Sequence, residues 1–460
     1  MYRKITGVPS SFRDPNGFVF KLEKDIFRRI TPAGLESYTQ LIDSGLYSKL
    51  VKEGLLVAHE EVPDPLSLKD GSKVIKPSKI HFISHPYEWC FSQLKDAALL
   101  TLEIQRTAIT HGMSLKDASA YNIQFNGCQP LFIDTLSFEH FNPTRPWVAY
   151  KQFCQLFMAP LALMACCDIR LSSLLKNYID GIPLDLASQL LHTKTWLRLG
   201  LLLHIHLHAR AQRRYANAGK NITNKAVHFS ERQHLGLLDS LITTVHSLNW
   251  TPGGTEWADY YSKTNYTNSA FAEKKEIIEK FLDIIRPKTL WDVGGNVGVF
   301  SRTASDRGIE TLCFDIDPSA IEFNYRLTKE RKDSHLLPLV FDLVNPSPGI
   351  GWENLERETL LDRGPCDTVL ALALIHHLAI SNNLPLTRIA SFFAKICTNL
   401  IIEFIPKEDS QVVRLLASRE DIFPHYTKEE FEREFSMFFE IKDSRTIEGM
   451  NRVIYFMVLQ

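Results

Sequence analysis

The chain has 460 residues, more than one ordinary hydrophobic core accommodates, so its length predicts two or three domains. Hydrophobic residues make up 45% and charged residues 23% of the chain, which is typical of soluble globular proteins. The 52 basic and 53 acidic side chains give a net charge of -1. This balance argues against a broad nucleic-acid-binding surface, and we expect no nucleic-acid partner.

The cysteine spacing indicates whether the chain binds a metal and in which compartment it lies, and the length of its apolar runs indicates whether it spans a membrane. The eight cysteines form no Cys-x-x-Cys pair and no metal-ligand spacing, so we expect reduced thiols, no metal site and a cytoplasmic protein. The longest apolar run, residues 153–167, contains Pro160 and is shorter than the ~20 residues of a membrane span. We therefore predict a buried helix there and no membrane span. No feature of the sequence indicates the oligomeric state.

Residues 1–209 are predicted to form an α+β domain that is mixed at first and almost purely helical from residue 141. The predicted strands are residues 16–20, 25–30, 55–62 and 79–89, and the predicted helix is residues 33–51. Asn126-Gly127 is a hairpin signal that pairs residues 123–125 with residues 130–134.

Residues 210–254 are predicted to be a polar linker followed by a connecting helix. From residue 255 to residue 460, helices alternate with continuous apolar runs that are typical of parallel strands buried on both faces. Asp317 and Pro318 mark the start of the helix after the second strand. The last segment, residues 438–459, predicts an antiparallel hairpin. The predicted fold class is therefore α/β, with a doubly wound Rossmann-like sheet and a terminal hairpin.

The turn after the first of these strands has the sequence WDVGGNVGVFS, and open parallel sheets bind ligands at such turns. It lacks the Lys-Ser or Lys-Thr pair of a phosphate loop, and Val299 stands at the third glycine position of a dinucleotide fingerprint. Gly294, Asn296 and Gly298 are instead spaced two apart after Asp292. Because asparagine tolerates left-handed backbone better than most residues, we expect Asn296 to preserve the turn.

This pattern resembles the Asp-x-Gly-x-Gly-x-Gly motif of class I S-adenosylmethionine-dependent methyltransferases, with asparagine at the middle glycine. The resemblance implies an S-adenosylmethionine site that also uses acids ending the next two strands. Asp315 stands about twenty residues on, where an acid accepts the ribose hydroxyls, and Asp342 is placed toward the adenine amino group. The implied cofactor residues are Asp292, Gly294, Gly295, Asn296, Gly298, Asp315, Ile316, Asp342 and Leu343.

Three side chains are candidate catalytic residues for methyl transfer. The reaction is an in-line displacement, so the enzyme positions the acceptor and removes its proton. His376 and His377 follow the fourth strand at the open edge of the cofactor site, and imidazole suits proton abstraction near neutral pH. The alternative for each is a structural histidine. Glu403, which ends the fifth strand, is a further candidate, and Trp352 and Arg357 are plausible acceptor contacts.

Three long phrases resemble a bacterial nodulation-protein-like methyltransferase family, at residues 345–367, 371–385 and 401–424. Because the acceptor of that family is poorly defined, the resemblance implies the reaction but not the substrate. We expect a small-molecule or saccharide acceptor.

A second constellation lies in the first half of the chain. Asp117, Asn122 five residues later, and Asp134 after the hairpin resemble the catalytic Asp, the metal-binding Asn and the metal-binding Asp of protein kinases. This resemblance implies a kinase-like domain with ATP and magnesium.

The kinase-like pattern is incomplete. Leu115 stands where kinases have histidine, and Asp134-Thr135-Leu136 replaces Asp-Phe-Gly. No clear glycine-rich loop is present, and the best stand-in for the ATP-contacting lysine is Arg28 or Arg29. Two alternatives therefore stay open beside a simple methyltransferase: a bifunctional methyltransferase-kinase, and a binding or scaffold protein with a degenerate kinase-like domain.

Overall fold

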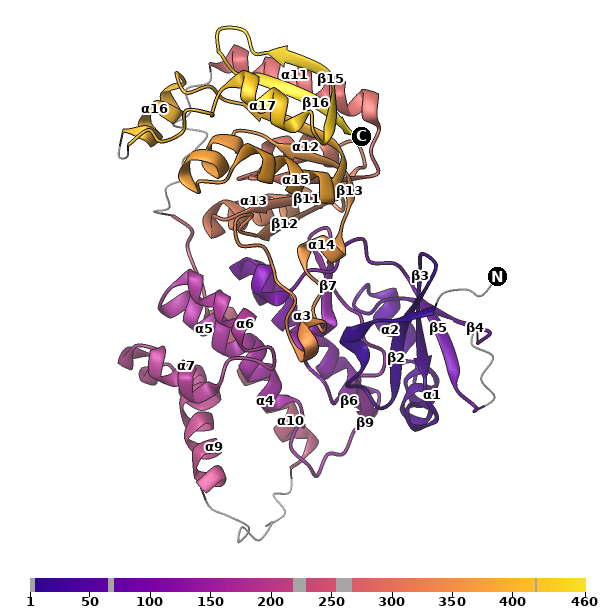
Figure 1. The fold of residues 1–460 in the computed structure, drawn as a ribbon. Helices are drawn as coiled ribbons and strands as arrows, with labels where there is room; N and C mark the ends of the chain where they lie inside the picture. The colour runs from indigo at the N-terminus through magenta and orange to yellow at the C-terminus, as the bar shows by residue number, and fades with distance from the viewer. Residues whose placement is uncertain (1–4, 65–69, 218–228, 254–266, 418–419) are drawn as a thin grey trace. The chain divides into compact units, whose positions relative to one another are not determined.

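The computed structural model describes residues 5–64, 70–217, 229–253, 267–417 and 420–460 (Figure 1). The chain divides into two compact units. The first unit is Met1–Thr251 together with Gly349–Arg357, and the second is Pro252–Pro348 together with Glu358–Gln460.

This division differs from the predicted boundaries in two ways. Helix α10 (Glu231–Ser247), predicted as part of a connector, belongs to the first unit, where Lys95 Nζ donates a 2.7 Å hydrogen bond to the carbonyl of Leu248 just beyond it. The short segment Gly349–Arg357 also folds with the first unit. Part of the predicted linker, residues 218–228, lies outside the described residues.

In the described residues, the first unit begins with a five-stranded antiparallel sheet of order β1-β2-β3-β5-β4. These strands are β1 (Ile5–Gly7), β2 (Gly17–Leu22), β3 (Asp25–Ile30), β4 (His59–Val62) and β5 (Lys73–Pro77). Helices α1 (Leu35–Asp43) and α2 (Leu46–Lys52) stand between β3 and β4, where one helix was predicted; Gly45, with φ of 76°, separates them. The predicted strands around β2, β3 and β4 are confirmed.

The predicted strand over residues 79–89 is wrong. That segment contains a short 3-10 helix, η3 (Pro86–Glu88), and in the part of the chain that the structure describes it joins no sheet. Two of its backbone donors bond to side chains. The Ser84 N–H donates to Gln124 Oε1 at 2.8 Å, and the His85 N–H donates to Glu88 Oε2 at 2.8 Å. The apolar residues that suggested a strand are there because the segment is buried. The strand next to β3 and β4 is instead β5, which lies earlier in the chain.

Two short hairpin-like pairs follow helix α3 (Phe91–Thr110). Strand β6 (Met113–Leu115) pairs with β9 (Phe138–His140), and β7 (Ile123–Asn126) pairs with β8 (Gln129–Phe132) as the Asn-Gly signal predicted. The remaining helices of the unit are α4 (Tyr150–Phe153), α5 (Ala159–Cys166), α6 (Leu174–Asn177), α7 (Leu184–Leu190), α8 (Leu199–Leu201), α9 (His208–Asn217) and α10. The apolar run predicted as a buried helix forms α4 and α5 with a π-helical turn between them. No described helix is long and apolar enough to cross a membrane.

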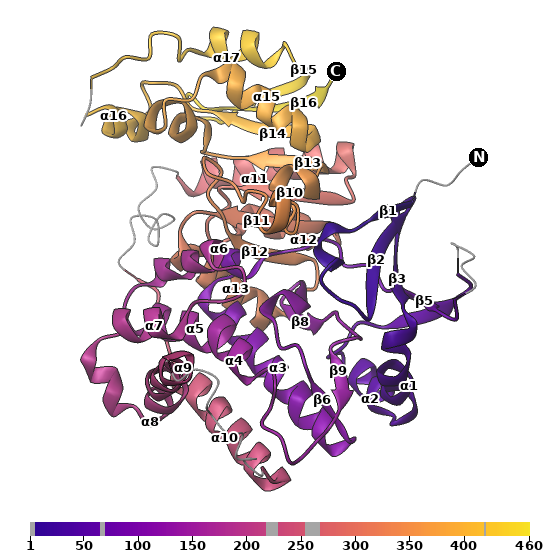
Figure 2. The ribbon, with the colours of Figure 1, turned by 60° about the horizontal axis from the view of Figure 1, so that its bottom comes forward.

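In the described residues, the second unit holds a seven-stranded sheet of order β12-β11-β10-β13-β14-β16-β15 (Figure 2). Strands β10 to β14 are parallel, and β15 and β16 add an antiparallel hairpin. The strands are β10 (Thr289–Val293), β11 (Glu310–Asp315), β12 (Leu336–Val340), β13 (Cys366–Ala371), β14 (Cys397–Phe404), β15 (Phe439–Thr446) and β16 (Val453–Leu459). This is the predicted doubly wound Rossmann-like sheet with its terminal hairpin.

Helices cover both faces of this sheet. Helices α11 (Asn268–Ile285) and α12 (Val299–Ser305) share an apolar core with Leu290, Ile401 and Phe456 on one face. Because side chains alternate along a strand, Phe404 of β14 points to the opposite face, where its ring lies 5.0 Å from that of Phe431. Other helices of this unit are α13 (Pro318–Arg331), α14 (Leu360–Arg363), α15 (Leu386–Ile396), α16 (Ser410–Leu416) and α17 (Lys428–Phe435).

Chain order explains where a ligand binds this sheet. After β10 the chain moves outward to β11 and β12, and then it returns to the other side of β10 to form β13. The connections diverge at the carboxyl ends of β10 and β13, which is where open α/β sheets bind ligands.

Candidate functional site

The turn between β10 and α12 has the conformation that its sequence predicts. Asn296 has φ of 50°, and its side-chain oxygen accepts a 2.8 Å hydrogen bond from the Val297 N–H. Gly298 has φ of 77°, and a Cβ there would lie 2.4 Å from Asn324 Nδ2. The left-handed backbone and the close approach explain why glycine is required at residue 298, and the asparagine substitution is confirmed to preserve the turn.

Asp315 joins the end of β11 to this turn. Its carboxylate accepts hydrogen bonds from the Asn296 N–H at 2.8 Å and from the Asp317 N–H at 2.9 Å, one on each oxygen. A carboxylate has about four lone-pair sites, so both oxygens retain capacity for further donors. The next side chain, Ile316, is 58% exposed, which leaves an apolar surface beside the acid. The pair suits a ribose and the purine attached to it.

Asp292 lies beneath the turn. Its carboxylate accepts a 2.6 Å hydrogen bond from the Ser301 hydroxyl, and the Gly294 and Gly295 N–H groups donate to the Phe314 carbonyl at 2.8 and 3.1 Å. Burial raises the pKa of Asp292 to about 6, and burial likewise raises the pKa of Asp315 to about 6. Two buried carboxylates that are reluctant to ionise favour a ligand that brings hydrogen-bond donors and positive charge.

Asp342 and Leu343 follow β12, and both are half-buried. Asp342 Oδ1 accepts a 2.9 Å hydrogen bond from the Val344 N–H, which fixes the carboxylate against its own turn. Parallel strands end at one edge of a sheet. Asp292 near the end of β10, Asp315 at the end of β11 and Asp342 just after β12 therefore lie at the same edge. The residues predicted for S-adenosylmethionine match the chemistry of that cofactor. Their carboxylates can accept hydrogen bonds from its ribose hydroxyls and its amino groups, and an apolar side chain can pack against its adenine.

His376 and His377 lie where the chain leaves β13, with ring centroids 4.1 Å apart. His376 is 3% exposed, and its Nδ1 atom has no hydrogen-bond partner among the described residues. Burial holds the pKa of His376 well below its usual range and lowers the pKa of His377 to about 4. Both imidazoles are therefore neutral at pH 7, the state that accepts a proton.

Glu403 is fully buried and sits inside an ion-pair network. Its Oε2 atom lies 2.6 Å from Lys274 Nζ and accepts a 2.8 Å hydrogen bond from the Ala373 N–H. Its Oε1 atom lies 3.8 Å from Arg452 Nη1. A carboxylate held between two cations is a poor proton acceptor, so this geometry favours a role in fixing the turn that leads to His376 over general-base catalysis.

Two members of this network escaped sequence reasoning. Lys274 lies in α11, and Arg452, which also pairs with Asp409 at 2.7 Å, lies just before β16. Both side chains are almost completely buried. The sequence signal for Lys274 was its position on the apolar face of an amphipathic helix. The charged residues around it in the sequence obscure this signal.

In the first unit, the three kinase-like residues are brought together. Asn122 Nδ2 donates to Ser137 Oγ at 3.1 Å, and the Ser137 hydroxyl donates to Asp134 Oδ2 at 2.8 Å. Burial raises the pKa of Asp117, and the nearby charge of Asp134 raises it further. Asp117 Oδ1 accepts a 2.8 Å hydrogen bond from Gln152 Nε2.

The structure distinguishes Arg28 from Arg29. Arg28 Nη1 lies 2.6 Å from Asp134 Oδ1, and Arg28 Nη2 lies 2.6 Å from Asp14 Oδ2 in the β1–β2 connection. Arg29 points elsewhere and pairs with Asp70. Of the two arginines, Arg28 is therefore the one that contacts the Asp134 carboxylate. Among the described residues, no group of three or more His, Cys, Asp or Glu side chains is arranged to hold a metal ion.

The expected acceptor contacts Trp352 and Arg357 lie in Gly349–Arg357, which folds with the first unit. Trp352 is 65% exposed. The Arg357 guanidinium carbon stands 3.8 Å from the ring centroid of Tyr121, the residue before Asn122. Arg357 is therefore in contact with the residue that precedes Asn122.

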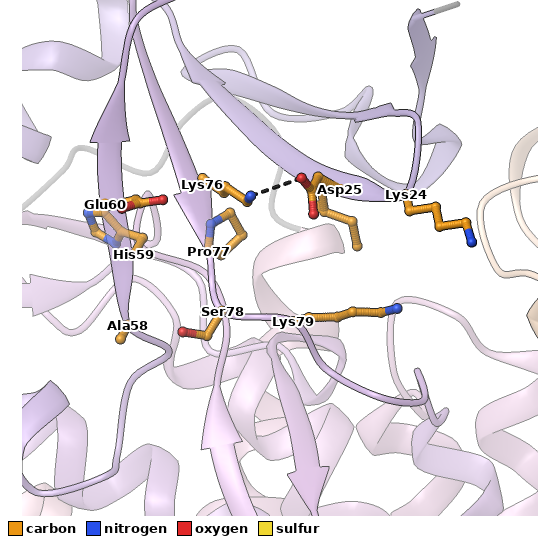
Figure 3. Close-up of a pocket in the computed structure, with 10 residues that line it drawn as sticks. Lys24, Asp25, Ala58, His59, Glu60, Lys76, Pro77, Ser78 and Lys79 are labelled. Atoms are coloured by element: carbon orange, nitrogen blue, oxygen red, sulfur yellow. Dashed lines mark hydrogen bonds and ion pairs between the residues drawn. The ribbon is translucent and has the colours of Figure 1, made fainter. Parts of the chain in front are cut away.

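A hollow of about 340 Å³ lies on the first unit between the β2–β3 turn and the strands β4 and β5 (Figure 3). Lys76 Nζ on its wall pairs with Asp25 Oδ2 at 2.9 Å, as the dashed line in Figure 3 shows. None of the site residues predicted from the sequence lines this hollow. We assign it no part in either candidate site.

The chain is 34% identical over 455 residues to the nodulation protein NoeA of Rhizobium meliloti (strain 1021), covering 97% of this chain and 95% of that protein. No family model matches the chain.

Solved structures of methyltransferases resemble parts of the chain. Monomeric WbdD is 17% identical, with 45% of each chain covered and a TM-score of 0.31. The magnesium protoporphyrin IX methyltransferase ChlM from Synechocystis PCC 6803 is 15% identical, with 44% of this chain and 92% of that chain covered and a TM-score of 0.32. The N-methyltransferase NodS from Bradyrhizobium japonicum WM9 is 11% identical, with 42% and 97% covered and a TM-score of 0.32. Likenesses this low carry no argument about activity.

Proposed function

The chain belongs to the family of the nodulation protein NoeA, and from that premise we propose that it is an S-adenosylmethionine-dependent methyltransferase acting on a small-molecule or saccharide acceptor. The observation that carries the proposal is the turn at residues 294–298 with Asp315 bonded to its backbone. That turn stands at the switch point of the seven-stranded sheet, where open α/β sheets bind ligands.

The chain's own residues have separate roles in this proposal. Asp315 would receive the ribose hydroxyls, Ile316 and Leu343 would flank the adenine, and Asp342 would face its amino group. Gly294 and Gly298 let the backbone approach the methionine part. Bound S-adenosylmethionine supplies an electrophilic methyl group on a sulfonium sulfur.

His376 and His377 serve the acceptor. His377 is less buried than His376, so we assign the acceptor contact to His377 and a positioning role to the deeper His376. A neutral His377 accepts the proton that the acceptor loses as it takes up the methyl group. Glu403 holds the preceding turn through Ala373 and so fixes where both rings lie.

A screen with a labelled methyl donor tests the proposed function. Purified full-length protein is incubated with metabolite and glycan extracts, and transfer of label is followed for wild type, His377→Ala and His376→Ala. We expect one acceptor class to be labelled by wild type and its labelling by His377→Ala to fall about 100-fold or more, within the range of a lost general base. Cofactor binding without transfer to any class would instead favour the binding or scaffold alternative.

Cofactor affinity should depend on pH through Asp315. Because burial raises the pKa of this carboxyl to about 6, it is ionised above pH 7 and protonated below pH 5. A protonated carboxyl loses acceptor capacity for the ribose hydroxyls, so the affinity should be flat above pH 7. It should fall by up to roughly tenfold per pH unit below pH 6. Calorimetric titration between pH 5 and 8 measures this. Asp315→Asn should reduce the slope and leave the part that is due to Asp292, whose pKa burial also raises to about 6. An unchanged slope in Asp315→Asn would assign the dependence to another group.

Phosphotransfer in the first unit is a second candidate function, which the gathering of Asp117, Asn122 and Asp134 favours. We expect ATP with magnesium to raise the melting temperature of full-length wild type but not of Asp134→Asn. Equal shifts, or no shift in wild type, would leave the degenerate kinase-like domain as the better description.

A further inference from the structure

The segment Gly349–Arg357, here called the strap, links the two units through the chain. It lies in sequence between β12 and β13 of the second unit, yet it folds with the first. Its base is closed by hydrogen bonds from the Arg357 N–H to the Ile350 carbonyl at 3.1 Å and from the Leu360 N–H to the Ser347 carbonyl at 3.4 Å. The strap is therefore a closed loop with a defined shape.

One anchor of the strap is Glu356, which is 4% exposed. It forms an ion pair with Arg13 in the β1–β2 connection, and this contact lowers the pKa of Glu356. A Cβ on Gly351, whose φ is 84°, would lie 2.0 Å from Glu356 Oε2. The Glu356 carboxylate therefore packs against the strap backbone at Gly351.

The other anchor is Arg357, whose guanidinium stands over the Tyr121 ring at 3.8 Å. A cation–π contact between arginine and an aromatic ring is strongest where water is excluded. Tyr121 lies in such a place, because burial is the main cause that raises the pKa of its hydroxyl to about 12. Arg357 is consequently held by a partly desolvated cation–π contact inside the first unit.

Both anchors adjoin the Asp117–Asn122–Asp134 centre. Arg13 precedes Asp14, which Arg28 bridges to Asp134. Tyr121 precedes Asn122 in the 3-10 turn η4 (Ala120–Asn122). The strap therefore holds the β1–β2 connection through one anchor and the turn that carries Asn122 through the other.

The other end of the strap leads to the methyl-donor site. Residues 342–348 run directly from Asp342 and Leu343 into the strap, and the Asn345 N–H donates to the Asp342 carbonyl at 3.2 Å. After the strap, the chain forms α14 and then β13, which ends before His376. The strap is the chain segment between the adenine-side acid and the acceptor-side histidines.

We propose that the strap couples the methyl-donor site to the Asp117–Asn122–Asp134 centre, so that filling the donor site orders the β1–β2 connection. This inference rests on the proposed function, since it takes Asp342 and Leu343 as cofactor residues. Coupling between two sites is reciprocal, so a conformation imposed on Tyr121 and Arg13 changes cofactor affinity by the same factor.

Hydrogen–deuterium exchange of the full-length protein, with and without S-adenosylhomocysteine, tests the coupling. In wild type we expect the ligand to slow exchange at residues 292–298, and also at residues 8–16 and 119–122. In Arg357→Ala the protection at residues 292–298 should persist while the protection at the two distant segments disappears. The dissociation constant of Arg357→Ala should rise about three- to tenfold, within the range by which residues between coupled sites change affinity.

Two controls separate coupling from packing. Arg388→Ala removes the same charge from an exposed position of α15, and Leu355→Ala removes a 55% exposed side chain from the strap itself. Both should behave as wild type. Arg13→Ala, whose side chain is 59% exposed, breaks the other anchor and should reproduce Arg357→Ala even if the latter folds poorly.

The outcomes are distinct. Protection of residues 292–298 without protection of residues 8–16 in wild type overturns the coupling and leaves the methyltransferase proposal standing. Distant protection that survives in both Arg357→Ala and Arg13→Ala also overturns it. Absence of ligand protection everywhere in wild type overturns the methyltransferase proposal and the coupling together.

Discussion

Replacing Glu403 with alanine should lower the free energy of unfolding of the second unit by about 3–5 kcal/mol, the range for breaking a buried ion pair by removing one partner. The substitution leaves Lys274 and Arg452 buried without their shared carboxylate, and both are at most 3% exposed. It also removes the acceptor of the Ala373 N–H. Because a two-unit chain need not unfold in one step, exchange of the slowest amides in β13 and β14 is the appropriate measurement.

Glu440→Ala provides the matched control for this result. Glu440 is 60% exposed and pairs with Lys442 on the surface, so its removal should change stability by less than about 0.5 kcal/mol. A loss below about 1 kcal/mol in Glu403→Ala would contradict the description of Glu403 as the centre of a buried network.

Replacing Asp315 with alanine should weaken S-adenosylmethionine binding about 100-fold or more. Hydrogen bonds to a charged group contribute about 1.5–3 kcal/mol each, and this carboxylate is assigned two from the ribose. The substitution also removes the acceptor for the N–H groups of Asn296 and Asp317, which loosens the turn. Calorimetric titration of the full-length protein measures the change.

Asp306→Ala is the control for Asp315→Ala. It removes an acid of the same unit that is 54% exposed and pairs with Arg331 outside the proposed site, and its affinity should equal that of wild type. Equal affinities in Asp315→Ala and wild type would remove Asp315 from the cofactor site.

The second unit was largely predictable because its signals are local. Continuous apolar runs ending in acids marked β10, β11 and β12, and the Asp317-Pro318 pair marked the first turn of α13, where Asp317 Oδ1 accepts from the Ser319 N–H at 2.8 Å. The left-handed conformation of Asn296 followed from residue chemistry alone. A turn between a strand and the next helix involves few residues, so a short stretch of sequence is enough to predict its geometry.

Features that depend on distant contacts were not predictable. The burial of Glu403 between Lys274 and Arg452 joins three elements that are far apart in the chain. The strap carries a tryptophan and an arginine that suggested acceptor binding, but Arg357 packs on Tyr121, more than 200 residues earlier. The sequence of a polar segment such as the strap does not indicate which part of the molecule it packs against.

In the first unit, the order of Asp117, Asn122 and Asp134 predicted a common centre, and the structure places them together. What the order did not reveal is that Arg28 binds Asp134 and Asp14 at once. The ATP measurement tests the proposed phosphotransfer at that centre.

The proposed methyltransferase function requires that the chain bind S-adenosylmethionine at residues 292–298 and 315–316. A crystal structure of the full-length protein grown with S-adenosylhomocysteine shows directly whether it does. We predict density for one ligand at the carboxyl ends of β10 and β11, with both ribose hydroxyls on the Asp315 carboxylate and the adenine against Ile316. Ligand density at another place, or a turn left empty at saturating ligand, would rule out this cofactor site.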